Sequence, residues 1–317
     1  MNLLKRALFA LAVASFSSLA MADERPVELV VPFSPGGATD SFARILAKEL
    51  GASLQVPVVV VNRPGAGGGV GAASVTKAAP DGKTILLGTI STHAINPALY
   101  KDLSYDANQD FTPVARVVAL PNLLAVSAAS DVTTVEELVA KSRKQPLTFG
   151  SPGSGTTSHL SGELMKQIRP EMQINHVPYR GSAPAITDLL GGHIDFQFDN
   201  ISALLPHVLA GKLRPLAVSS TTPSEQLPQV KPLAEQGFAN YEIVSWFGLW
   251  LPKGASTETV SRLNQALAQI YAKPDFVKTL TDASITPSYL PGADFDRFVR
   301  SEQDKWRDVV QSAGLKL

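Results

Sequence analysis

The chain has 317 residues, of which 44% are hydrophobic and 18% charged, and it contains no cysteine. This composition excludes wholesale disorder, and the balance of 28 basic against 28 acidic side chains gives no basic surface for nucleic acid. The lack of cysteine excludes disulfides, thiolate metal sites and cysteine nucleophiles, while the length predicts about two domains.

The N-terminus has the pattern of a secretory signal peptide. Lys5 and Arg6 precede a short apolar run, and Ala20 and Ala22 supply the small residues that precede a cleavage site. We therefore predict that residues 1–22 are a signal peptide, cleaved after Ala22, and that the mature chain is a soluble protein of the periplasm. Cleavage leaves 26 basic side chains against 28 acidic ones, so the mature chain is slightly acidic.

The first part of the mature chain alternates short apolar strands with amphipathic helices. The hydrophobic pattern predicts strands over 27–33, 56–61 and 84–87 and helices over 42–50 and 70–79. Near-continuous apolar strands that are joined through helices are typical of a parallel sheet covered on both faces.

The same alternation begins again after about residue 120. The pattern predicts strands over 123–126, 147–149, 177–179, 194–198 and 216–218 and helices over 132–141, 159–168, 182–190 and 201–210. Thr134 and Glu137 have the spacing of a capping box, and we expect Ser182 to cap its helix.

The C-terminal part has too few elements for a third domain. An aromatic apolar segment over 246–251 is followed by helices near 260–270 and 294–312. We expect this part to return to the first domain, which gives lobe one from 23–119 and 246–317 and lobe two from 120–245. Two chain crossings then form a hinge, with a ligand cleft between the lobes.

Two glycine turns open helices at matching places in the two lobes. Residues 34–40 read SPGGATD and residues 151–157 read SPGSGTT, and each turn follows a predicted strand. The free N–H groups and the dipole of a helix N-terminus favour an anion, and glycine lets a ligand come close to them. The alternative interpretation is an ordinary tight turn in each lobe.

The motifs for nucleotides and for catalysis are incomplete. Gly150 and Gly155 have P-loop spacing, but Thr156 stands where the P-loop lysine is needed. The glycine-rich segment 65–71 partly matches a dinucleotide fingerprint, but 62–64 separates it from the strand. There is no G-x-S-x-G or H-E-x-x-H motif, so we predict no catalytic residue, no metal and no cofactor.

Polar residues follow several predicted strands. Ser91, Thr92 and His93 come after the strand at 84–87, and ligands of open parallel sheets bind beyond such strand ends. His93 could equally support the loop. In lobe two, Tyr179 and Asp199 also follow strands, and Asp199 could accept a bond from a ligand, orient a water or cap a helix.

Several stretches, in order along almost the whole mature chain, carry a resemblance to a known family. They read VVPFSPGGATD, VNRPGAGGGVGAA, PDGKTILLGTIST, FGSPGSGTTSHLSGELM, HVPYRGSAPAITDLLGGHIDFQFDN, AGKLRPLAVSS and FVRSEQDKWRDVVQSAG. The chain resembles the Bug receptors, which are the periplasmic solute-binding receptors of tripartite tricarboxylate transporters. The resemblance implies a two-lobed α/β periplasmic binding protein, type II-like, with a mostly parallel sheet flanked by helices in each lobe.

The resemblance also implies how such a receptor works. It closes on a small carboxylate, held by backbone amides, hydroxyls and waters, and delivers it to the membrane transporter. The carboxylate could be a di- or tricarboxylate, an acidic amino acid or an aromatic acid. The implied contacts are Phe33, Pro35, Gly36, Gly37, Ala38, Thr39, Asp40, Ser91, Thr92 and His93 in lobe one, and Ser151, Gly155, Thr156, Thr157, Tyr179 and Asp199 in lobe two.

We expect a monomer that is not an enzyme and has no nucleic-acid partner. Two alternatives remain open at this point. One is a ligand-sensing adaptor that signals to a sensor kinase with the same fold and cleft. The other is a hydrolase that uses His93 with Asp40 or Asp199.

Overall fold

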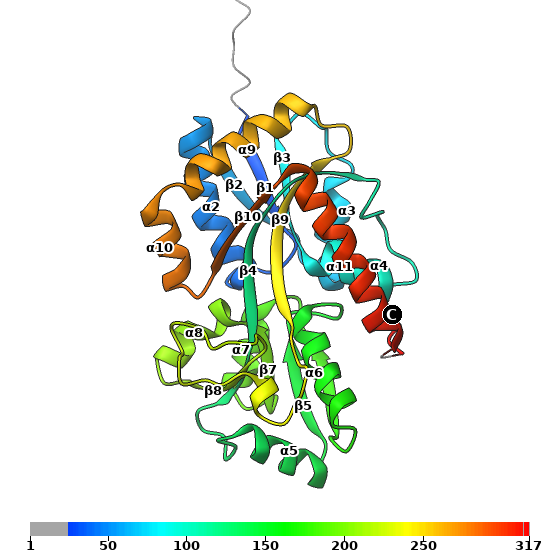
Figure 1. The fold of residues 1–317 in the computed structure, drawn as a ribbon, viewed down its shortest axis with the longest axis vertical. Coiled ribbons are helices and arrows are strands. Elements are labelled where there is room, and N and C mark those ends of the chain that lie inside the picture. The colour runs from blue at the N-terminus through cyan, green and yellow to red at the C-terminus, as the bar shows by residue number, and fades with distance from the viewer. Residues whose placement is uncertain (1–24, 313, 317) are drawn as a thin grey trace, which may run out of the picture.

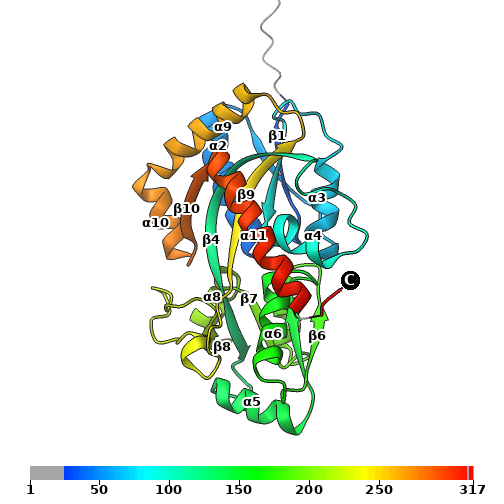
Figure 2. The same cartoon turned by 45° about the vertical axis from the view of Figure 1, so that its right-hand side comes forward.

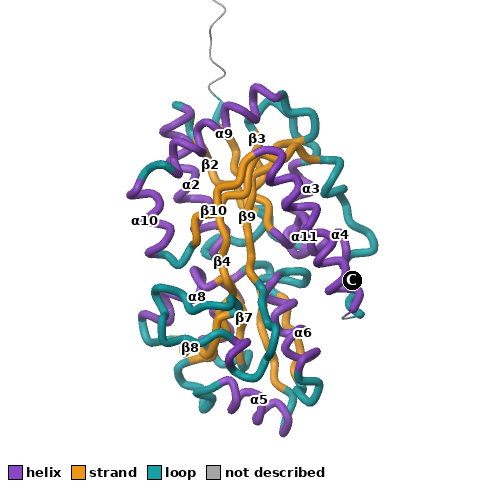
Figure 3. Tube along the Cα trace, viewed as in Figure 1, coloured by secondary structure: helices purple, strands orange, loops and turns teal. Residues whose placement is uncertain are grey.

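The structure is a computed structural model, and it describes residues 25–312 and 314–316. The predicted signal peptide and its cleavage site lie outside the described residues. Two lobes are stacked along the long axis of the molecule, with strands at the centre and helices around them (Figures 1 and 3).

The chain builds most of the upper lobe first and then enters the lower one. The upper lobe begins with β1 (Val27–Val31), α2 (Ala38–Leu54), β2 (Val58–Asn62), the 3-10 turn η1 (Ala66–Gly68), α3 (Gly69–Val75), β3 (Thr84–Thr89), the π-helical turn η2 (Ser91–Ile95) and α4 (Asn96–Leu99). The long strand β4 (Phe111–Ser127) then runs from the upper lobe into the lower one (Figure 1).

The lower lobe is followed by a return to the upper one. The lower lobe contains α5 (Val135–Lys144), β5 (Leu147–Ser151), α6 (Thr157–Ile168), β6 (Ile174–Pro178), α7 (Ser182–Leu190), β7 (Phe196–Asn200), α8 (Ile201–Leu209), β8 (Leu213–Val218) and η3 (Leu233–Glu235). The return consists of β9 (Val244–Pro252), α9 (Thr257–Tyr271), α10 (Pro274–Asp282), β10 (Thr286–Pro291) and α11 (Gly292–Ser312).

One curved sheet runs through both lobes. Its strand order is β2-β1-β3-β9-β4-β7-β5-β6, and β8 and β10 also pair with β4. The pairs β1–β2, β1–β3, β5–β6 and β5–β7 are parallel. The α/β fold class with two lobes is therefore confirmed.

The two strands that join the lobes run antiparallel to their neighbours. β4 pairs with β9 as far as Pro121 and then, from Asn122, with β7. The sequence pattern predicted only 123–126 of β4, because Pro113 and Pro121 interrupt the apolar run and proline is unusual inside a sheet. α10 and β10 were also missed: β10 contains two prolines and is mostly half-buried.

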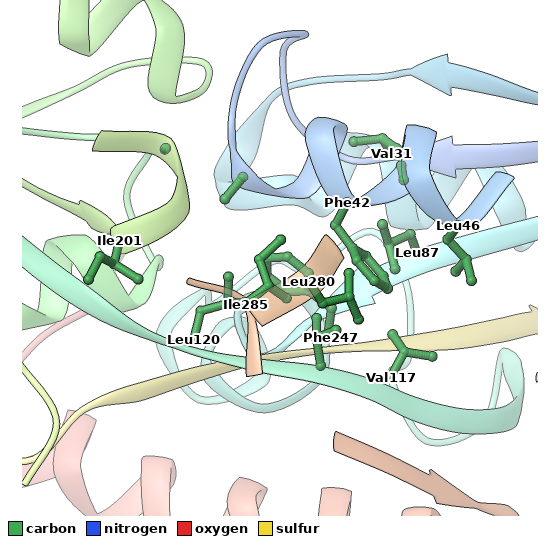
Figure 4. Close-up of a cluster of buried hydrophobic side chains, with 14 of the residues drawn as sticks. Val31, Phe42, Leu46, Leu87, Val117, Leu120, Ile201, Phe247, Leu280 and Ile285 are labelled. Carbon is green, nitrogen blue, oxygen red and sulfur yellow. The ribbon is translucent and has the colours of Figure 1, made fainter. Parts of the chain in front are cut away.

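The core lies on both faces of this sheet. Along β9, Phe247 and Leu249 pack into one buried cluster and Trp246 and Trp250 into the other, as strand alternation requires. Figure 4 shows Phe42 of α2 above Phe247, and the two ring centroids are 6.2 Å apart. This packing fixes the N-terminal end of α2 above the centre of the sheet.

The helix starts obey local capping rules in one case and depart from them in another. The capping box of α5 is confirmed, because the Glu137 N–H donates to Thr134 Oγ1 at 3.1 Å and the Glu137 carboxylate accepts from the Thr134 N–H. Ser182, in contrast, is the first residue of α7, and Gly181 occupies the N-cap position. The expectation that Ser182 caps its helix was therefore wrong by one position.

Candidate functional site

A cavity lies between the lobes at the point where α2, α6, α7 and α8 begin. The empty space among its lining atoms, counted together with the open solvent at its mouth, is about 370 Å³. It is lined by Phe33, Gly37, Ala38, Thr39, Thr89, Ser91, Pro152, Thr156, Thr157, Ser158, Ser182, Asn200, Ser245 and Phe247.

The N-terminus of α2 forms the upper wall. Gly37 is the N-cap of this 17-residue helix, and no side chain of the described residues caps it. The first N–H groups of a helix have no partner within the helix, and they carry the positive end of its dipole. Ala38 and Thr39 line the cavity, so this wall offers donors to an anion.

Asp40 holds this turn from the outside of the cavity. Its carboxylate accepts from the Gly36 N–H at 3.0 Å, from the Arg44 guanidinium at 3.0 Å and from Asn62 Nδ2 at 3.0 Å. Burial alone would raise the pKa of Asp40, but these hydrogen bonds outweigh it and lower the pKa. Asp40 is thus an ionised anchor whose charge is compensated by Arg44.

The N-terminus of α6 forms the facing wall. Thr156 is the N-cap: its Oγ1 accepts from the His159 N–H at 3.2 Å and donates to the Gly153 carbonyl at 2.7 Å. The Thr157 hydroxyl lines the cavity and is 3.4 Å from Asn122 Oδ1, so α6 is tied to β4 where that strand enters the lower lobe.

Two more helix starts, α7 and α8, complete the lower wall. Ser182 opens α7 and Asn200 is the N-cap of α8, and neither helix has a side-chain cap among the described residues. Asn200 Oδ1 and, on the upper wall, Thr89 Oγ1 are buried and have no hydrogen-bond partner within the described chain. These atoms can bond a ligand or a water in the cavity.

Asp199 lies behind this wall, fully buried. Its carboxylate accepts from Gln197 Nε2 at 2.9 Å and from the Asn200 N–H at 2.8 Å, and the Ser182 hydroxyl also bonds to it. Burial outweighs these bonds and raises the pKa of Asp199 to about 7. Asp199 therefore touches the cavity only through Ser182 and Asn200.

His93 is packed in the core of the upper lobe. Its ring stacks on Trp250 with centroids 3.6 Å apart, and its Nδ1 is 2.8 Å from Thr92 Oγ1. Burial lowers the pKa of His93 to about 3, so the imidazole stays neutral. Thr92 and His93 support the turn that presents Ser91 to the cavity, which agrees with the alternative that His93 supports the loop.

The cavity brings together part of the predicted set. It is lined by Phe33, Gly37, Ala38, Thr39, Ser91, Thr156 and Thr157. The other predicted residues are close to these but outside the lining, and they are Pro35, Gly36, Asp40, Thr92, His93, Ser151, Gly155, Tyr179 and Asp199. Among them, Tyr179 donates to Asp188, and Ser151 bonds His176.

Sequence reasoning missed half of the lining. The missed residues are Thr89, Pro152, Ser158, Ser182, Asn200, Ser245 and Phe247. Ser182 and Asn200 stand at strand-to-helix turns, so the signal used for the glycine turns could have found them. Ser245 and Phe247 reach the cavity through the crossing strand β9, which no local pattern reveals.

The side chains that line the cavity are uncharged. Hydroxyls, one amide, backbone groups and two phenylalanines make up the wall, with no acidic, basic or histidine side chain among the described lining residues. Within residues 25–312 and 314–316, no group of three or more potential ligands could hold a metal ion. The same residues include no helix that is long and apolar enough to cross a membrane.

The amino-acid sequence matches a family model over residues 42–315, and the model is that of the tripartite tricarboxylate transporter family receptor. The chain belongs to this receptor family. It is similar to Protein BugT of Bordetella pertussis, with 35% identity over 296 residues that cover 92% of this chain and 90% of BugT. The resemblance to the Bug receptors is thereby confirmed.

Solved structures of similar chains share the fold. The structure described as R. palustris Rpa4515 with adipate is 37% identical, has a TM-score of 0.89 and covers 93% of this receptor and 99% of its own chain. MatC from Rhodopseudomonas palustris with bound malate is 30% identical and has a TM-score of 0.83. The match covers 91% of this receptor and 99% of the MatC chain. The family consists of solute-binding receptors and not of enzymes, so the hydrolase alternative is excluded.

Proposed function

We propose that this receptor captures a small organic acid in the periplasm by closure of its two lobes and delivers it to a tripartite tricarboxylate transporter. The observation that carries the proposal is the cavity, because four helix N-termini surround a space with no charged lining side chain. Such a site attracts an anion through dipoles and N–H donors. The adipate and malate in the similar structures support a carboxylate.

The lobes of the working protein are proposed to be 23–119 with 246–317, and 120–245. β4 and β9 are then the hinge, and Ser34 and Arg180 meet across the cleft, where the Arg180 carbonyl accepts from the Ser34 N–H at 3.2 Å and from its hydroxyl at 2.8 Å.

The ligand would stabilise the closed arrangement because it contacts both lobes at once. One carboxylate accepts from the N–H groups at the N-terminus of α2. The other end of the acid, with the second carboxylate of a diacid, lies at the N-terminus of α6. Only the closed state offers both sets of contacts, so binding shifts the population toward it.

A thermal-shift panel tests the proposal. The panel contains adipate, malate, tricarboxylates, acidic amino acids and aromatic acids, each beside its neutral amide where one exists. A ligand at about 100 times its Kd adds roughly 2.7 kcal/mol to the free energy of unfolding, which raises the melting temperature. If no acid shifts the melting temperature at millimolar concentration, the proposed function is wrong. Uptake of the best acid by cells with and without the receptor then tests delivery.

A further inference from the structure

The glycine-rich segment 65–71 has no place in the cavity lining, although its sequence is unusual. Gly67, in η1, lies instead against the second glycine turn in the other lobe. A Cβ atom on Gly67 would be 2.2 Å from the carbonyl oxygen of Ser154, and the φ of Gly67 is +57°. The backbones of the two lobes therefore touch at a place where no side chain fits.

A second glycine faces this contact from the lower lobe. Gly155 has a φ of +80°, and a Cβ atom there would be 2.4 Å from Asn96 Oδ1. The fully buried Asn96 also donates from Nδ2 to the Gly67 carbonyl at 3.1 Å, and Tyr100 donates from its hydroxyl to the Ser154 carbonyl at 3.2 Å. We call Gly67, Asn96, Tyr100, Ser154 and Gly155 the glycine clasp.

The clasp is one of the contacts between the lobes that flank the cavity. Another is the contact of Ser34 with the Arg180 carbonyl. The clasp continues directly into the cavity wall, because Pro152 and Thr156, on either side of Ser154, both line it. The contact of Ser154 with Gly67 and Tyr100 therefore helps to fix the position of the turn at 152–156, and with it the cavity wall.

We propose that Gly67 and Gly155 are positioning residues for ligand binding, because only glycine at these places lets the two lobes come together around the cavity. The inference rests on the proposed function. Neither glycine touches the ligand. Each acts through the clasp on the position of the cavity wall.

Gly67→Ala is the sharpest variant. The added methyl group collides with a backbone carbonyl of the other lobe, which cannot turn away as a side chain could. The apparent Kd of a ligand rises in inverse proportion to the fraction of protein that can close, so a closed population ten times smaller weakens binding about tenfold. We expect about a tenfold loss or more for Gly67→Ala, and a smaller loss for Tyr100→Phe, which removes only one clasp bond.

Gly192→Ala is the matched control. Gly192 also has a positive φ, +72°, but nothing lies within 4 Å of the position of its Cβ. Both alanine variants carry the strain of a left-handed residue, and only Gly67→Ala adds the collision between lobes. The melting temperatures of the two variants show whether both are folded.

The experiment measures the distance between the lobes directly. Because the chain has no cysteine, spin labels can be placed on Lys101→Cys, beside α4, and Gln167→Cys, in α6, and both positions are exposed. α4 of the upper lobe and α6 of the lower lobe lie on the same side of the molecule (Figure 2). Distance distributions are recorded for the labelled parent, Gly67→Ala, Tyr100→Phe and Gly192→Ala, without ligand and with adipate or malate at millimolar concentration.

We expect Gly192→Ala to keep the short-distance population that the parent shows. Gly67→Ala should lose this population, and Tyr100→Phe should lose a smaller part of it. Identical distributions in the parent and Gly67→Ala would overturn the clasp. If acids bind the parent and Gly67→Ala equally well, the clasp is wrong while the proposed function stands. If the parent binds no acid of the whole panel but Gly67→Ala still loses the short distance, the clasp stands and the proposed function fails.

Discussion

Replacing Thr156 by aspartate should abolish carboxylate binding without unfolding the protein. Thr156 is the N-cap of α6 and lines the cavity. Aspartate is as good an N-cap as threonine or better, and its charge suits the positive end of a helix. The variant therefore keeps α6 folded while it places a negative charge where the ligand carboxylate should lie.

The magnitude follows from the separation of the two charges. Two unit charges about 4 Å apart repel by about 4 kcal/mol at an effective dielectric constant of 20, and about half of that remains if water enters the cleft. A loss of about 2–4 kcal/mol corresponds to a Kd about 30–1000 times weaker. The Thr156→Asp variant also loses the hydroxyl that donates to the Gly153 carbonyl.

Thr156→Asn separates these effects, since asparagine has the shape of aspartate, caps helices equally well and is neutral. Isothermal titration of the parent, Thr156→Asn and Thr156→Asp with the best acid of the panel measures the effect. We expect Thr156→Asn to bind and Thr156→Asp to show no heat of binding. Equal affinity of the two variants would refute the placement of the carboxylate at α6.

Three further predictions concern titratable residues around the cavity. The pKa of Asp199 is raised from 3.8 to about 7, so between these pH values the folded protein keeps a proton that the unfolded chain releases. The free energy of unfolding should therefore fall as the pH rises from about 4 to 7. Urea denaturation should show no such fall in Asp199→Asn. The pKa of Asp40 is lowered, so the stability that its carboxylate contributes is present above pH 3.8 and is lost as the pH falls through the lower pKa of the folded protein. Asp40→Asn should cost about 2 kcal/mol at neutral pH and should reduce the loss of unfolding free energy at acid pH. An unchanged loss at acid pH would contradict the anchor role of Asp40. His93→Ala should cost about 3 kcal/mol through lost packing on Trp250, with the Kd for the acid changed less than about threefold; a large loss of affinity without loss of stability would make His93 a ligand contact.

The fold was predictable because most elements have local signals. Apolar strands such as β1, the capping box of α5 and the periodic face of α2 are visible in the chain, and their order indicates two α/β lobes. The antiparallel crossing strands were hidden, because β4 contains Pro113 and Pro121 and pairs with strands far along the chain. Only the tertiary structure shows that one strand serves both lobes.

The candidate site was predictable where a local turn makes it. The turns at 34–40 and 151–157 place Thr39 and Thr157 in the lining, as a helix N-terminus after a strand requires. Which side chains of a turn face the cavity could not be predicted. His93 follows Ser91 by two residues, but its ring points into the core and stacks on Trp250. The side of a turn that faces the cleft depends on packing that the sequence pattern does not contain.

We propose that the cavity holds a carboxylate through helix N-termini and hydroxyls without a cationic side chain. The most direct measurement is isothermal titration of the unlabelled receptor with each acid of the panel and with its neutral amide, which has nearly the same shape. We expect at least one acid to bind with a Kd in the micromolar range or below, and its amide not to bind. Equal binding of an acid and its amide, or no binding by any acid, would contradict it.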